Sequence, residues 1–234
     1  MTTIEKIYFR LMNTYGPQGW WPLCRYKGEN PTKTGSLKGY HPFRYDFPRK
    51  RAELFEICVG AILTQNTSWP QVEKALSSLH ALGAVAPKKL LSLSDTKLKT
   101  AIRSAGYFNM KAKKLKKFAE FFLSLRGRVP SREELLDVWG IGPETADSML
   151  LYAWRVPTFV VDAYTKRIFS HLGMIGPKAS YDDIKRIFEQ VLASDLVVFQ
   201  EYHALIVEHA KRFYSKRPYG SGCFLIEEFG KVGQ

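Results

Sequence analysis

The segment that most constrains this chain is Val-Trp-Gly-Ile-Gly-Pro-Glu-Thr-Ala, at residues 138–146. Gly140 and Gly142 stand between two stretches whose apolar residues recur at helical spacing, and Pro143 is typical of the first turn of a helix. Glycine lets the backbone turn sharply, and the N–H groups at this helix start, that of Thr145 included, suit an anion such as a DNA phosphate. The segment therefore predicts two helices joined by a tight hairpin, which either binds a phosphate or serves only as a connection.

Helical periodicity extends over most of the chain. Besides the two helices of the hairpin, we expect helices at residues 1–15, 52–65, 69–82, 87–92, 95–105, 110–126, 163–172, 180–193 and 196–215. Ser68 and Gln71 have the spacing of a capping box at the start of one of them. The segment from Gly16 to Arg51 is dense in Gly, Pro and aromatic residues, so it is expected to be irregular. Strand-like alternation is scarce, and the sequence predicts an all-α fold.

The charge balance indicates which class of partner the protein could bind. The 234 residues include 35 Lys and Arg against 22 Asp and Glu, a net charge of +13. Such an excess favours a polyanionic partner, because each phosphate neutralised releases counterions. Basic charge also keeps unrelated proteins soluble, so charge alone does not decide the matter. The densest basic run fits either a solvated helix face or a phosphate-facing flank, and it consists of Lys111, Lys113, Lys114, Lys116 and Lys117.

The number and spacing of the cysteines indicate whether disulfides or a cysteine metal site are expected. Cys24, Cys58 and Cys223 are odd in number and far apart, which argues against a disulfide framework and a cysteine-only metal site. No other clustered ligands point to a catalytic metal, so none is expected. The N-terminus has no apolar signal-peptide core, and no segment of the sequence approaches the roughly 20 apolar residues of a membrane span. We expect a cytoplasmic protein that is a monomer and has no membrane partner.

Asp162 follows Glu144 by eighteen residues, directly after two valines. The hairpin and this aspartate resemble the helix-hairpin-helix and the catalytic aspartate of the endonuclease III superfamily of DNA base-excision glycosylases. The resemblance implies two helical lobes with a DNA-binding cleft between them. Residues 51–157 are expected to form one lobe that ends in the hairpin, and residues 1–50 plus 158–234 the other.

The resemblance also implies a role for Asp162. Breaking an N-glycosidic bond builds positive charge on the sugar, so a fixed carboxylate beside that carbon stabilises the transition state and can orient the attacking water. Aspartate is also a preferred residue at helix N-caps, and the two roles are compatible.

The chain departs from the family at two places. In members that also cut the backbone, a lysine of the hairpin motif forms a Schiff base with the sugar, and Glu144 occupies that place here. Because a carboxylate cannot form an imine, we expect a monofunctional enzyme without lyase activity. Many relatives hold an iron–sulfur cluster through four cysteines near the C-terminus, where this chain has only Cys223 between residues 209 and 229. We therefore expect neither an iron–sulfur cluster nor any other cofactor.

Three further segments resemble the bacterial 3-methyladenine DNA glycosylases of this superfamily, and with the hairpin the resemblance spans about residues 4–215. They are Trp-Trp-Pro at 20–22, Val-Gly-Ala-Ile-Leu-Thr-Gln-Asn-Thr at 59–67, and Gly-Tyr-Phe-Asn at 106–109, which Lys-Ala-Lys at 111–113 follows. In that family a flipped base stacks between aromatic faces. The resemblance assigns these faces to Trp20, assisted by Trp21, and to Trp69. The alternative is that all three tryptophans are core residues.

Three polar residues complete the expected site. Gln65 or Asn66 would enter the gap left by the flipped nucleotide, or would only cap a helix. Lys211 matches a position that lines the base pocket, although a lysine there repels a cationic base. It could also pair with Asp162, hold a phosphate, or be a solvated surface residue.

These features predict a monofunctional DNA glycosylase of base excision repair that hydrolyses alkylated purines such as 3-methyladenine in damaged double-stranded DNA. An electron-rich indole attracts a cationic purine and thereby favours alkylated over normal bases. The alternatives are a glycosylase for a deaminated or mismatched base, and a non-catalytic DNA-binding protein in which the hairpin only holds phosphates.

Overall fold

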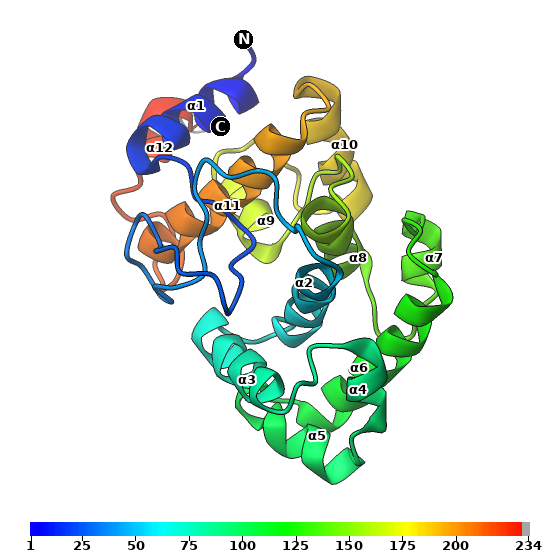
Figure 1. Cartoon of the computed structure of the whole chain (residues 1–234). Helices are drawn as coiled ribbons and strands as arrows, with labels where there is room; N and C mark the ends of the chain where they lie inside the picture. The colour runs from blue at the N-terminus through cyan, green and yellow to red at the C-terminus, as the bar shows by residue number, and fades with distance from the viewer. Residues whose placement is uncertain (231–234) are drawn as a thin grey trace.

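The computed structural model describes residues 1–230, which form helices joined by loops and by an irregular arm at residues 16–50 (Figure 1). The α-helices are α1 (Thr3–Tyr15), α2 (Arg51–Leu63), α3 (Trp69–Ala81), α4 (Pro87–Ser92), α5 (Asp95–Ala101), α6 (Phe108–Ser124), α7 (Arg132–Leu136), α8 (Pro143–Ser148), α9 (Ala163–His171), α10 (Tyr181–Val191), α11 (Leu196–Phe213) and α12 (Phe224–Phe229). A 3₁₀ turn, η1 (Arg103–Ala105), precedes α6, and a π-helical turn, η2 (Met149–Ala153), continues α8. The described residues contain no strand beyond one isolated bridge between Glu29 and Lys38, so the all-α prediction is confirmed.

The helices form two lobes. Helices α2 to α8 make one lobe, and α1 with α9 to α12 makes the other, so that both ends of the described chain lie in the same lobe (Figure 1). Helix α2 is central because its sequence is apolar nearly all round, and every residue from Phe55 to Leu63 is buried. The π-helical turn η2 contacts both α2 and α11 and so joins the lobes. The division at residues 51–157 remains a proposal.

Several local predictions can be compared with the structure. Thr2 and Ser131 cap α1 and α7 through capping boxes, and Asp162 caps α9 as expected. The capping box predicted at Ser68 is wrong, because the Gln71 N–H donates to the Ser68 carbonyl oxygen at 3.0 Å and the Ser68 side chain makes no cap. Helix α12 was not predicted. No described helix combines the length and the apolar character needed to cross a bilayer.

Candidate active site and nucleic-acid interface

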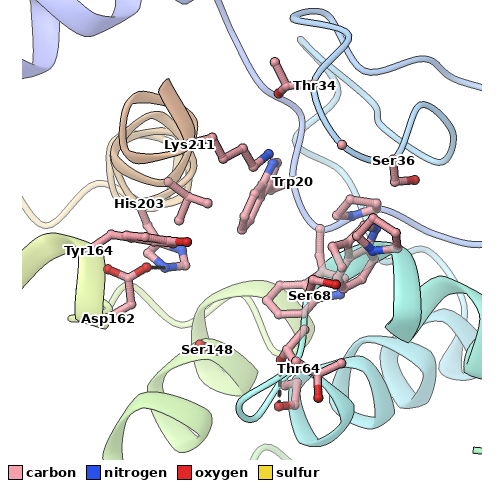
Figure 2. Close-up of a pocket in the computed structure, with 18 of the residues that line it drawn as sticks. Trp20, Thr34, Ser36, Thr64, Ser68, Ser148, Asp162, Tyr164, His203 and Lys211 are labelled. Atoms are coloured by element: carbon pink, nitrogen blue, oxygen red, sulfur yellow. Dashed lines mark hydrogen bonds and ion pairs between the residues drawn. The ribbon is translucent and has the colours of Figure 1, made fainter. Parts of the chain in front are cut away.

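A cavity of about 690 Å³ opens where the two lobes meet (Figure 2). Four regions line it, namely the irregular arm of residues 16–50, the turn between α2 and α3, the start of α8, and one face of α11 together with the start of α9. All four predicted base-pocket residues, Trp20, Trp21, Trp69 and Lys211, are on its wall, and so is Asp162. The fold thus brings together residues that are up to 191 positions apart in the sequence, Trp20 and Lys211 being the extremes.

Asp162 uses its two carboxylate oxygens differently. Oδ1 accepts hydrogen bonds from the Thr165 N–H at 2.7 Å and from the Thr165 hydroxyl at 2.8 Å, which makes Asp162 the N-cap of α9. Oδ2 accepts neither bond, and it lies 3.8 Å from Nε2 of His203. The cap therefore holds the carboxylate in place while it leaves one oxygen available for chemistry.

Glu144 lies on the same wall, at the start of α8. Its side chain is open to the cavity but surrounded by protein, and this environment raises the pKa of Glu144 to about 7. The negative charge of Asp162 adds to the increase, and Lys166 opposes it. The cavity therefore holds two carboxyl groups of different character within electrostatic reach of each other.

The tryptophans form one edge-to-face cluster. The ring centroids of Trp20 and Trp21 are 6.0 Å apart, and those of Trp21 and Trp69 are 5.5 Å apart. Trp21 is only 6% exposed, and its Nε1 lies 3.0 Å from where a Cβ on Gly60 would stand, so a larger residue at position 60 would press on the indole. Trp20 and Trp69 are half-buried. Trp21 thus supports the wall, whereas Trp20 and Trp69 have free ring surface.

Three buried carboxylates hold the arm that carries Trp20 and Trp21. Glu56 of α2 accepts the Cys24 N–H at 2.6 Å, and Glu201 of α11 accepts the Gln18 N–H at 2.7 Å. Glu208, two helical turns further along α11, accepts the Thr34 hydroxyl. All three are less than 5% exposed. An arm without regular structure is therefore fixed by charge-assisted hydrogen bonds, which are stronger than neutral ones.

Lys211 bonds to one of these carboxylates. Its Nζ lies 3.5 Å from Oε2 of Glu208. Lys211 therefore pairs with a carboxylate, but this is Glu208 and not Asp162, the partner that the sequence analysis considered. Burial lowers the pKa of Lys211, and Glu208 opposes this shift.

Gln65 connects the turn after α2 to the hairpin. Its Nε2 donates to the Gly140 carbonyl at 3.1 Å and to the Thr145 hydroxyl at 3.0 Å, while Lys114 donates to its Oε1. Asn66 beside it is exposed and has a positive φ of 52°. Gly140 also requires glycine, with φ at 89° and the Lys114 side chain against it. The DNA contacts predicted for Gln65, Asn66, Gly140, Gly142 and Thr145 remain predictions.

The basic run is only partly a solvated face. Lys111 is buried, and its Nζ donates to the Leu63 carbonyl, the Ala105 carbonyl and the Thr67 hydroxyl at 2.7–2.8 Å. Burial lowers the pKa of Lys111 to about 8. This lysine fixes the turn that carries Gln65 and Asn66.

His203 lines the cavity, and the sequence analysis did not single it out as a functional residue. A signal for it was available. His203, Val207 and Lys211 follow one another at intervals of four on α11, and all three line the cavity.

One group within residues 1–230 has metal-ligand chemistry, and it consists of Cys24, Glu56 and His80. His80 Nε2 lies 2.9 Å from one oxygen of Glu56, and the Cys24 N–H donates to the other. The carboxylate is thus satisfied by the protein itself.

The chain is similar over nearly its whole length to a protein of Methanocaldococcus jannaschii named "Putative DNA repair glycosylase MJ1434", at 43% identity over 97% of this chain and 94% of the other. Endonuclease III of Sulfolobus acidocaldarius is 29% identical over 75% of this chain and 81% of its own length. Among solved structures, an endonuclease III in a non-covalent DNA complex matches with a TM-score of 0.76 at 16% identity, over 99% of this chain and 96% of the other. The 3-methyladenine DNA glycosylase MagIII of H. pylori, bound to 1,N6-ethenoadenine, matches with a TM-score of 0.66 at 25% identity, over 91% and 98%.

These relatives correct the cofactor prediction. Endonuclease III homologues usually carry a 4Fe–4S cluster, which contradicts the expectation that no cofactor belongs here. The expectation rested on a count of cysteines in one region of the chain.

The residues present nevertheless do not fit four-cysteine ligation. Sγ of Cys223 lies 3.1 Å from His209 Nε2 and accepts the Tyr214 hydroxyl at 3.6 Å, while Cys58 is buried in α2 and Cys24 is on the arm.

The family follows from the match with a family model, which covers the α2–α3 turn, the hairpin and Asp162. The model is described as "HhH-GPD superfamily base excision DNA repair protein", and it matches residues 59–194. The chain belongs to this superfamily of helix-hairpin-helix DNA glycosylases.

Proposed function

We propose that the protein is a monofunctional DNA glycosylase that hydrolyses the N-glycosidic bond of alkylated purines such as 3-methyladenine. The observation that carries this proposal is the free Oδ2 of Asp162 on the wall of a cavity that Trp20 and Trp69 also line. A nucleotide flipped into this cavity would bring its sugar toward the carboxylate and its base toward the indoles. The hairpin would hold a neighbouring phosphate through its backbone N–H groups.

The preference for alkylated purines rests on the charge of the base. A cationic purine gains about 0.5–2 kcal/mol from an indole face, and an uncharged base does not gain this. The Asp162 carboxylate on the wall also favours a cation in this cavity. The likeness to MagIII, whose solved structure holds 1,N6-ethenoadenine, supports a modified purine as the base but not the preference for charge, because ethenoadenine is neutral.

The proposal that the enzyme has no lyase activity rests on the positions of the lysine side chains around the cavity. Glu144 begins α8 near Asp162, at the place where lyase members have their lysine. Lys211 is the one lysine on the wall of the cavity within residues 1–230, and it follows His203 by eight residues, or about 12 Å along α11. Because His203 is the neighbour of Asp162, this amine lies away from the carbon that a Schiff base would need.

Base release from methylated DNA tests the proposal. Bases freed by the wild type and by Asp162→Asn are separated by chromatography. Asparagine caps helices about as well as aspartate, so the variant should fold normally while base release falls by at least about 100-fold. Equal release by both proteins would refute the role of Asp162.

The same assay separates the alternatives. Duplexes that contain uracil, hypoxanthine or an oxidised pyrimidine would reveal a glycosylase with another lesion preference, to which the endonuclease III relatives point. Tight binding without release of any base would indicate a DNA-binding protein. Borohydride trapping of a covalent complex would overturn the monofunctional assignment.

A further inference from the structure

His203 stands at the meeting point of three elements around the cavity. It projects from α11 toward Asp162 at the start of α9, as Figure 2 shows, and it also packs against η2. Its ring meets Trp20 edge-on, with the centroids 5.6 Å apart, and the residue is only 4% exposed. A polar ring buried between the substrate wall and the catalytic carboxylate needs a physical explanation.

The hydrogen bonds around His203 select one form of its ring. The Tyr152 hydroxyl donates to the Gln200 carbonyl at 3.0 Å and lies 2.8 Å from Nδ1 of His203. A hydroxyl has one proton, and with that proton on Gln200 the short contact requires Nδ1–H to donate to the tyrosine oxygen. Nε2 then has a lone pair and is a hydrogen-bond acceptor.

Nε2 faces the free oxygen of Asp162 at 3.8 Å. This separation is too long for a direct hydrogen bond, but a water can lie about 2.8 Å from both atoms. A water that donates one hydrogen to each acceptor turns its oxygen lone pairs away from both. Because His203 and Asp162 line the cavity, these lone pairs point toward the place of a flipped nucleotide.

We propose that His203 is a second base of the active site, and that its Nε2 and Oδ2 of Asp162 together hold the attacking water. This inference rests on the proposed function. The water oxygen bonds to C1′ of the sugar as the bond from C1′ to the purine nitrogen breaks, and the electron pair of that bond leaves with the base, which neutralises a cationic purine. One water proton passes to Nε2, and Asp162 remains a carboxylate that stabilises the positive charge on the sugar.

The surroundings keep His203 ready to accept a proton. Burial lowers the pKa of His203, and Asp162 opposes the shift, so the ring is neutral at neutral pH. The other titratable groups around this pair are Tyr152 of η2, Glu201 of α11, Glu144 of α8, and Tyr164 and Lys166 of α9 (Figure 2). Burial raises the pKa of Tyr152 well above its usual value, so this hydroxyl keeps its proton.

The test compares His203→Gln with a matched variant, His209→Gln. Both histidines are buried on α11, but His209 faces Tyr15 and Cys223, away from the cavity. Single-turnover base release is measured from pH 4 to 9, and binding to a duplex with a tetrahydrofuran abasic-site analogue is measured alongside. His203→Gln should lower the rate constant by about 100-fold or more and remove the fall in rate at acid pH that protonation of His203 causes, with analogue binding unchanged. His209→Gln should keep the wild-type rate and pH profile.

A second measurement does not depend on activity. Nitrogen-15 NMR of the histidine rings in the wild type should show His203 as the Nδ1–H form at pH 7, and Tyr152→Phe should release this restriction and slow base release. Finding the Nε2–H form would overturn the proposal. It would also be overturned by a slower His203→Gln enzyme with the wild-type pH profile, since this would indicate a positioning role only. If the wild type instead releases a different lesion, the proposed substrate fails while the same comparison on that lesion still decides the role of His203.

Discussion

A buried ion pair between α7 and α8, which α10 of the other lobe also contacts, allows a quantitative prediction. Asp147 of α8 is 0% exposed, and Arg132 of α7 donates to it through Nε at 2.9 Å and Nη2 at 3.3 Å. The hydroxyl of Tyr181, from α10 in the other lobe, donates to the same carboxylate at 2.8 Å. Arg132 also bonds to Asp182 of α10 at 2.8 Å, but that side chain is 57% exposed.

Replacing Asp147 by asparagine should cost about 3–5 kcal/mol of unfolding free energy. The substitution keeps the shape of the side chain but leaves the partly buried guanidinium of Arg132 without its main counter-charge. Breaking a buried ion pair in this way typically lowers the free energy of unfolding by about 3–5 kcal/mol. For a chain of this length each kcal/mol shifts Tm by about 2–4 °C, so a decrease of roughly 6–20 °C is expected. Asp182→Asn removes the exposed contact of the same arginine and should cost at most about 1 kcal/mol.

Urea and thermal unfolding of the two variants measure the difference. Both remove one carboxylate from Arg132, so the net charge changes equally, whereas the burial of the carboxylate and its hydrogen bonds to Arg132 and Tyr181 differ. If Asp147→Asn is within about 1 kcal/mol of the wild type, or if both variants lose the same stability, the reasoning from burial is wrong. Arg132→Met combined with Asp147→Leu replaces the pair by apolar groups and should recover much of the loss.

Three further predictions concern the cavity. Trp69→Ala should reduce the release of a cationic base about 2- to 30-fold more than the release of a neutral ethenoadenine, because only the first loses a cation–π contact of about 0.5–2 kcal/mol, and equal losses in parallel kinetics would contradict this. In the folded protein the pKa of Glu144 is raised to about 7, against 4.5 for an ordinary glutamate. Glu144 therefore stabilises the fold most below pH 4.5, and this contribution is lost progressively as the pH rises to 7. Tm should fall from pH 5 to pH 8, and the fall should be smaller in Glu144→Gln than in the wild type. Gly60→Ala should cost about 1–3 kcal/mol and alter tryptophan fluorescence, because the new methyl group meets Trp21 Nε1 at 3.0 Å; an unchanged spectrum and Tm would indicate that the wall can yield.

The helices could be predicted because their signals are local. Helix α9 shows this best, since Asp162 is both the N-cap that the sequence indicates and the residue that the resemblance assigns to catalysis. The hairpin is equally local, because two glycines, a proline and the following apolar positions fix where α8 begins. The capping box at Ser68 failed for an equally local reason, as a tight turn had already engaged the Gln71 N–H.

The buried lysine shows the limit of such reasoning. In the sequence Lys111 belongs to a run of basic residues, and nothing nearby distinguishes it from Lys113. It is buried because the end of α2 and the end of η1 present carbonyl oxygens to it, 48 and 6 residues away. A carbonyl cluster formed by two elements has no signature in the composition of either element.

The irregularity of the arm at residues 16–50 was predicted, but its path could not be, for the same reason. This matters for function because the arm carries two of the three tryptophans that line the cavity. Its backbone has few regular hydrogen bonds of its own, so Glu56 and Glu201 accept N–H groups of the arm, and Glu208 accepts the Thr34 hydroxyl. In the sequence these glutamates have the appearance of ordinary solvated charges. Each is buried because it accepts hydrogen bonds from the arm, and without them an unpaired buried carboxylate would destabilise the helix that carries it. The position of the indole wall is therefore determined by α2 and α11, and substitutions at these glutamates should impair base recognition even though none of them touches the base.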